Sequence, residues 1–326
     1  MPKLQPAVMT LNFRIPATGT RGWIDIAQAA SIVNRRFYRQ GLQWAVSSIA
    51  MTQKSATATT NTLRVETLPT TWVTSNAWHK AMAHWLKQQN DDADESGAES
   101  AIARYRDFKI FMDDAHVDDY YDSGGQNLNN TNLIPRYFGG AFSTGEWEPS
   151  EIVVPNDVAD GTGSEVDPQE FHLHMVGPNY NAGHATRSRG IIDGYANSRA
   201  LPQSPDPRSF GVPTDANWMA TMFDVGNDNL EVLANAIDKN DDLPYNQVEY
   251  PGGEVNAPGL QMCSEFFMSG SGTINTRVVA PGFVAPCGLI KITNEVASGD
   301  SPEIDIQVNL VAGSHRGYLA EPMQDM

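Results

Sequence analysis

Cysteine and long apolar runs are both scarce in this chain of 326 residues. The two cysteines, Cys263 and Cys287, are too few for a disulfide framework, so we expect free buried thiols; a pair across neighbouring strands is the alternative. No apolar run approaches the roughly 20 residues that a membrane-spanning helix needs. No long apolar stretch follows Lys3, which argues against a secretory signal and against a membrane partner.

Several catalytic motifs are also missing from the sequence. It contains no Gly-x4-Gly-Lys-Ser/Thr phosphate loop and no Gly-x-Ser-x-Gly elbow. The acidic stretch "DDAHVDDYYDSG" lacks the register of an EF-hand, so a solvated loop is the first interpretation and a calcium ion held by loops the second. These absences favour a protein that is not an enzyme and that carries no cofactor.

The strand-like stretch "FHLHMVG" places His172 and His174 on one face, because side chains repeat every two residues along a strand. Two imidazoles in this arrangement could hold a divalent metal, as in the HUH nucleases that start rolling-circle DNA replication. Those enzymes also need a nucleophilic tyrosine with a lysine three residues later, and no Tyr-x-x-Lys follows His174. We therefore expect two histidines on a half-exposed strand and no metal site, with a nuclease as the weaker alternative.

Positive charge is concentrated near the start of an otherwise acidic chain of net charge −17. Residues 1–65 carry one acidic residue, Asp25, and a balance of +7, which leaves −24 for the remainder. Such a separation of positive from negative charge can orient a protein against a polyanion or against neighbouring subunits. The basic residues are Lys3, Arg14, Arg21, Arg35, Arg36, Arg39, Lys54 and Arg64.

The densest part of this region is "RRFYR", which has the composition of a phosphate-contacting surface. The same arginines could instead pair with carboxylates of a neighbouring subunit, and both interpretations remain open. The candidate contact residues for nucleic acid or for a neighbouring subunit are Arg14, Arg21, Arg35, Arg36, Tyr38 and Arg39.

The pattern around this stretch predicts an amphipathic helix. Asp25 is a plausible N-cap, Gly41 is well placed to follow the last turn, and Arg35 and Arg39 would lie on the exposed side. The buried face would consist of Ile26, Ala29, Ala30, Val33 and Phe37.

Strand-like segments occur along the whole chain, with helical periodicity at 76–89 and 216–238. In the last strand Ile304, Ile306, Val308 and Leu310 alternate with polar neighbours. Because the segments show no regular βαβ alternation, we predict a mainly β protein: an antiparallel jelly-roll (Greek-key) sandwich with two or three helices inserted in long loops. It would form one domain over 1–326, with its basic region at 1–65. The strands are expected at 8–16, 42–52, 55–69, 146–155, 170–177, 259–270, 272–281, 287–295 and 302–313.

Four blocks of the sequence resemble capsid proteins of small circular single-stranded DNA viruses known from environmental samples. These blocks are "WIDIAQAASIVNRRFYRQGLQWAV", "SEIVVPND…FHLHMVG", "ANSRALPQSPDP" and "APCGLIKI…IQVNLVAGSHRGYLAEPMQDM". The resemblance implies a major coat protein with a viral jelly roll that self-assembles into an icosahedral shell around DNA. Its location would be the virion, after synthesis inside the host cell, and its partners would be further copies of itself and viral single-stranded DNA. A carbohydrate- or calcium-binding β-sandwich is the main alternative.

Overall fold

The structure is a computed structural model and describes most of the chain. The described residues are 6–17, 19–54, 59–97, 106–120, 132–145, 147–154, 169–178, 180–181, 187–200, 259–270, 275–298 and 301–326. The helix expected at 216–238 lies outside them.

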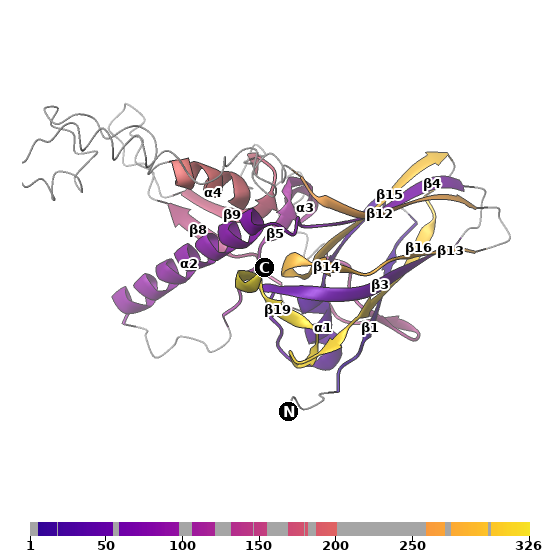
Figure 1. The fold of residues 1–326 in the computed structure, drawn as a ribbon, viewed down its shortest axis with the longest axis horizontal. Coiled ribbons are helices and arrows are strands. Elements are labelled where there is room, and N and C mark those ends of the chain that lie inside the picture. Colours follow the sequence, from indigo (N-terminus) through magenta and orange to yellow (C-terminus); the bar gives the residue numbers. More distant parts are fainter. Residues whose placement is uncertain are drawn as a thin grey trace, which may run out of the picture.

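Two antiparallel sheets form the larger part of the described fold (Figure 1). The first has the strand order β1–β16–β3–β13, and two short strands, β14 and β19, also pair with β3. The bounds of these strands are Thr10–Ile15 (β1), Glu303–Leu310 (β16), Leu42–Lys54 (β3), Thr276–Ala280 (β13), Phe283–Ala285 (β14) and Ala320–Pro322 (β19).

The second sheet has the order β12–β4–β15–β2, and every neighbouring pair in it is antiparallel. The strands are Gln261–Gly270 (β12), Thr59–Thr67 (β4), Leu289–Ser298 (β15) and Arg21–Asp25 (β2). A β-bulge in β12 lies between Met262 and Ser264. Both sheets combine strands from the two ends of the sequence.

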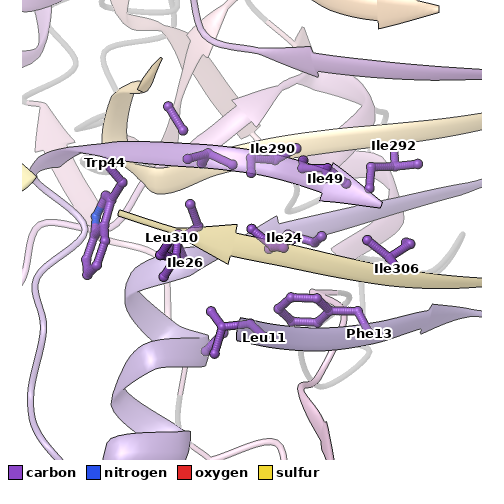
Figure 2. Packing of buried hydrophobic residues seen from close by; sticks show 14 of the residues in the cluster. Leu11, Phe13, Ile24, Ile26, Trp44, Ile49, Ile290, Ile292, Ile306 and Leu310 are labelled. Carbon is purple, nitrogen blue, oxygen red and sulfur yellow. The ribbon is translucent and has the colours of Figure 1, made fainter. Parts of the chain in front are cut away.

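The two sheets face each other across one hydrophobic core (Figure 2). Phe13 and Ile306 from the first sheet pack in the same cluster as Ile24 and Ile292 from the second. The strand β16 alternates buried and half-buried residues along its whole length, which confirms the predicted pattern. Burial of a large apolar side chain of this kind contributes about 1.5–3 kcal/mol, so this cluster is the main source of stability for the paired sheets.

The first helix, α1 (Ile26–Asn34), is shorter than expected. The carboxylate of Asp25 accepts a hydrogen bond from the backbone N–H of Gln28 at 3.0 Å, which confirms the predicted N-cap. The helix ends where Arg35 takes a left-handed conformation with φ 54°. The segment 35–41 therefore lies outside the helix.

A long insertion between β4 and β12 carries a third sheet, which is mixed rather than antiparallel. Its order is β10–β11–β9–β5, with β8 also paired to β9, and β5, β9 and β11 run parallel. Parallel neighbours require crossover connections, which this long insertion provides. The strands are Phe111–Asp113 (β5), Glu151–Val154 (β8), Gln169–Val176 (β9), Tyr180–Asn181 (β10) and Arg187–Gly190 (β11).

The helices of the insertion cover this third sheet and join it to the paired sheets. Contacts link α2 to α4, and α4 to β9. A second hydrophobic cluster includes Trp78 and Phe108 from the insertion together with Trp23 and Leu289 from the second sheet. No helix among the described residues is long and apolar enough to cross a membrane. The helices are Trp72–Glu95 (α2), Asp114–Tyr120 (α3) and Ile191–Ala200 (α4).

The remaining elements are short. A hairpin of β6 and β7 packs beside β1, and a second hairpin of β17 and β18 precedes the C-terminus. The expected mainly β class, with antiparallel sheets and few helices, is confirmed, and the parallel strands of the insertion are an addition to it. These elements are Arg136–Tyr137 (β6), Gly140–Ala141 (β7), Ala312–Gly313 (β17), Gly317–Tyr318 (β18), and the 3-10 turns Pro286–Gly288 (η4) and Met323–Asp325 (η5).

Candidate functional site

A groove with a volume of about 760 Å³ lies between α2 and the end of the paired sheets. Figure 1 shows the elements that carry parts of its lining, among them α2 and the C-terminal end of the chain. The lining comes from four parts of the chain: residues 37–42, α2, residues 106–108 and residues 315–324. The groove therefore exists only once the insertion has packed against the paired sheets.

Aromatic side chains form one wall of the groove. Trp78 and Trp85 are seven residues apart on α2, which places them on the same helix face two turns apart. The Phe108 ring lies 6.0 Å from the Trp78 ring and 5.6 Å from the Trp85 ring, measured between centroids. Trp78 and Phe108 are buried, whereas Trp85 is half-buried and presents part of its ring to the groove.

Gly41 allows this wall to approach the paired sheets. A Cβ atom at this position would collide with the Trp78 indole ring. The sequence suggested Gly41 as the residue that ends a helix, but its role here is close packing, because the helix has already ended at Asn34.

Three guanidinium groups belong to the same lining: those of Arg39, Arg106 and Arg316. Arg106 donates to the Asn90 side-chain oxygen at 2.6 Å, and Arg316 donates to the Phe37 carbonyl. Arg39 and Arg316 are exposed, and Arg106 is half-buried. The groove thus gathers positive charge in a protein of net charge −17.

Asp107 brings a carboxylate into the lining. Burial raises its pKa to about 6, opposed by the nearby Lys109 and by the hydrogen bond that it accepts from the Gln40 backbone at 3.0 Å. The pKa of His315 is lowered by burial and by the neighbouring Arg316, so this imidazole is neutral at pH 7. In the described lining, three guanidinium groups therefore face a single carboxylate.

The predicted patch "RRFYR" is brought only partly into this site. Arg39 lines the groove. Arg35 and Arg36 are exposed, and Arg36 donates to the Pro6 carbonyl at 3.3 Å. The prediction that a helix displays these arginines is wrong, because the left-handed residue Arg35 ends α1 before the other two.

Tyr38 is buried and cannot contact a partner. Its side chain is 2 % exposed, its ring packs against Trp44 and Tyr318, and its hydroxyl donates to the Arg316 carbonyl at 3.1 Å. The prediction of Tyr38 as a contact residue is therefore corrected: it supports the turn that carries Arg316.

Arg14 and Arg21 are engaged within the chain. Arg14 binds Asp305 at 2.7 Å across the pair β1–β16, and Arg21 binds Asp119 of α3 at 2.6 Å. Lys54 and Arg64 also form ion pairs with carboxylates on neighbouring strands. Four of the eight basic residues of region 1–65 thus meet carboxylates, because the fold brings acidic residues distant in sequence to these cations.

His172 and His174 are both buried on β9, not half-exposed. The Nδ1 of His174 lies 2.6 Å from the Ser188 hydroxyl, and the Nε2 of His172 lies 3.3 Å from a Glu151 carboxylate oxygen. Burial lowers the pKa of His172 to about 4. Within the described ranges, no group of three or more His, Cys, Asp or Glu side chains is placed to hold a metal ion.

The two cysteines are free thiols in the structure. Cys287 is fully buried beside Met323, as expected, whereas Cys263 in the bulge of β12 is half-buried. Burial raises the pKa of Cys263 to about 11, so the thiol stays protonated at neutral pH.

Sequence reasoning missed most of the groove. Trp78 is buried in the second hydrophobic cluster, whereas Trp85 packs against that cluster and keeps part of its surface exposed. Arg316 stands alone in its segment, and nothing in "RYRDFK" marks Arg106 as a residue of the groove. No family model matches the chain, and no match is found among curated proteins or solved structures.

Proposed function

We propose that this chain is the major coat subunit of a virus, and that its paired sheets are a jelly roll. The observation that carries the proposal is the nested strand pairing. With the short strands β14 and β19 set aside, the first described strand of the paired sheets in chain order pairs with the eighth, the second with the seventh, the third with the sixth and the fourth with the fifth. Such nesting corresponds to one long antiparallel hairpin wrapped into two sheets, and it supports a jelly roll, an architecture used by viral capsid proteins and by lectins.

Exposed aromatic side chains support assembly rather than a free monomer. Phe138 at the tip of the β6–β7 hairpin is fully exposed, and Phe267 on β12 is 83 % exposed. The hairpin is held in place by the ring contact of Tyr137 with Phe142 and by a backbone hydrogen bond from Phe142 to Pro135. Contacts between copies would remove such rings from water.

The positive groove supports the second part of the proposal, which is a shell that encloses single-stranded DNA. Arg39, Arg106 and Arg316 concentrate cations on one side of an acidic protein. A nucleic-acid partner is recognised first through its phosphates. The proposed role is structural, without catalysis, and the proposed location is the virion.

The test is expression of the protein alone, followed by electron microscopy and light scattering across a range of ionic strengths. We expect regular closed particles, with nuclease-protected DNA inside when single-stranded DNA is present. A stable monomer under all conditions overturns the proposal. If such a monomer is retained on glycans or is stabilised against heat by calcium, the alternative function is favoured, which is a carbohydrate- or calcium-binding β-sandwich.

A further inference from the structure

The groove beside α2 has the size of a small-molecule site. Its volume of about 760 Å³ falls within the range of ligand pockets and is large enough for a nucleotide. Hydrogen bonds outside the groove hold the segments that line it. The buried Tyr38 hydroxyl donates to the Arg316 carbonyl, and the Gln40 side chain forms two hydrogen bonds with the backbone of Ile110. The site is therefore preformed, which lowers the entropic cost of binding.

The lining combines aromatic residues, which suit a base, with arginines, which suit a phosphate. The half-buried ring of Trp85, supported by Phe108, offers a flat apolar surface of the kind on which a base stacks. The guanidinium groups of Arg39, Arg106 and Arg316 come from three different segments and supply the donors that a phosphate accepts.

Alternative ligands fit this lining less well. A bare anion would leave the Trp85 surface in water, and an uncharged aromatic compound would bring no negative charge to the three arginines. A neutral sugar could use the aromatic surface but would gain nothing from the concentration of positive charge. The combination of charge and flat apolar surface selects a ligand that is both anionic and aromatic.

We infer that this groove binds a nucleotide, with its phosphate at Arg39, Arg106 and Arg316 and its base against Trp85. The inference deepens the proposed function. It rests on that function in one respect only, namely that the nucleotide belongs to a strand of DNA enclosed by the shell. A free nucleotide has the same chemistry, and the experiment separates the two sources.

The experiment is a calorimetric titration of the purified protein with dTMP, with oligo(dT) and with inorganic phosphate. We expect dTMP to bind at least tenfold more tightly than phosphate, because stacking on Trp85 adds to the charge interaction. Tighter binding of oligo(dT) per site would identify a strand as the ligand, whereas equal affinity would identify the free nucleotide. Equal affinity for dTMP and phosphate overturns the inference.

Two pairs of variants localise the binding. We expect Arg39→Ala to weaken dTMP binding about tenfold, whereas Arg277→Ala, which removes the same charge from the exposed strand β13, leaves it unchanged. Trp85→Leu should weaken dTMP but not phosphate, and Trp85→Phe should keep most of the dTMP affinity. Thermal unfolding checks that each variant is folded.

The possible results separate the inference from the proposed function. If particles form but Arg39→Ala and Arg277→Ala bind dTMP equally, the groove is not the site and the shell proposal stands. If dTMP binds as described but particles never form, the nucleotide site stands and the shell proposal fails.

Discussion

Asp25 illustrates how one buried residue can connect three parts of the fold. Its carboxylate caps α1 through the Gln28 backbone and also accepts hydrogen bonds from Trp147 at 2.9 Å and from the Gln40 side chain at 3.2 Å. Burial raises its pKa, and these hydrogen bonds oppose that shift. The sequence predicted the cap correctly, because a cap depends on neighbours in the chain. It could not predict Trp147, which arrives from the insertion.

We expect Asp25→Ala to lower the free energy of unfolding by about 2–4 kcal/mol, because it removes the cap and leaves the Trp147 indole N–H buried without its acceptor. Denaturant unfolding measures the effect. The control is Asp91→Ala on the exposed surface of α2, which should change stability by less than about 0.5 kcal/mol. Equal losses in both variants would contradict the assigned role of Asp25.

Asp107 should make stability depend on pH in the acid range. Its folded pKa of about 6 lies above the ordinary value of 3.8, so the folded state holds its proton more tightly than the unfolded state does. Its stabilising contribution is complete below about pH 4 and is lost as the pH rises through about 6. The loss amounts to up to about 3 kcal/mol.

The variant Asp107→Asn cannot titrate but keeps an oxygen that can accept from the Gln40 backbone. We expect the difference in unfolding free energy between Asp107→Asn and the unchanged protein to increase between pH 4 and pH 6 and then to level off. Denaturant unfolding at a series of pH values gives this difference. A difference that is constant across this range would show that Asp107 titrates normally.

At the scale of single elements, sequence patterns predicted strands well where apolar and polar residues alternate. They predicted the first and last residues of helices less well. The helix predicted at 76–89 extends over Trp72–Glu95, because its N-cap is Thr71, upstream of the predicted start. Ser75, inside the first turns of this helix, donates its hydroxyl to the Met323 carbonyl. The pattern of α1 gave its start correctly, but the left-handed turn at Arg35 interrupts a sequence that otherwise continues to look helical.

This left-handed turn gives a prediction about the end of α1. Arg35 has φ 54°, where a side chain is strained and glycine is favoured, so Arg35→Gly should raise the free energy of unfolding by about 0.5–1 kcal/mol. The neighbouring Arg36 has no positive φ, so Arg36→Gly should lower it by a similar amount. Thermal or denaturant unfolding compares the two. Stabilisation by both variants, or by neither, would count against this explanation.

At the scale of the whole molecule, the long strands were predictable from the sequence, whereas their partners and the short strand β2 (Arg21–Asp25) were not. The alternation in β16 marks a strand with one buried face, but nothing in that segment indicates that β1 and β3 are its neighbours. The same limit applies to the groove, whose walls come from both ends of the chain and from the insertion. It also applies to the charges, because Arg14 meets its partner Asp305 only after β1 and β16 have paired.

If the shell proposal holds, the β6–β7 hairpin should matter for assembly and not for folding. Replacing the fully exposed ring in Phe138→Ser should reduce the yield of particles at least tenfold, because a contact between copies loses a large apolar side chain. The unfolding temperature should stay unchanged. The conservative variant Phe138→Tyr should still assemble, and light scattering of all three proteins provides the comparison.

The position of β16 between β1 and β3 has a consequence for how the protein is made. A ribosome makes residues 303–310 only after β1, β3 and the whole insertion, so the first sheet lacks an inner strand until that point. Until then, β1 has no partner strand in that sheet, and long-range pairing of this kind is slow to form. The unpaired edges of β1 and β3 are open to other nascent chains during this interval, so newly made chains would depend on protection from one another until β16 is inserted.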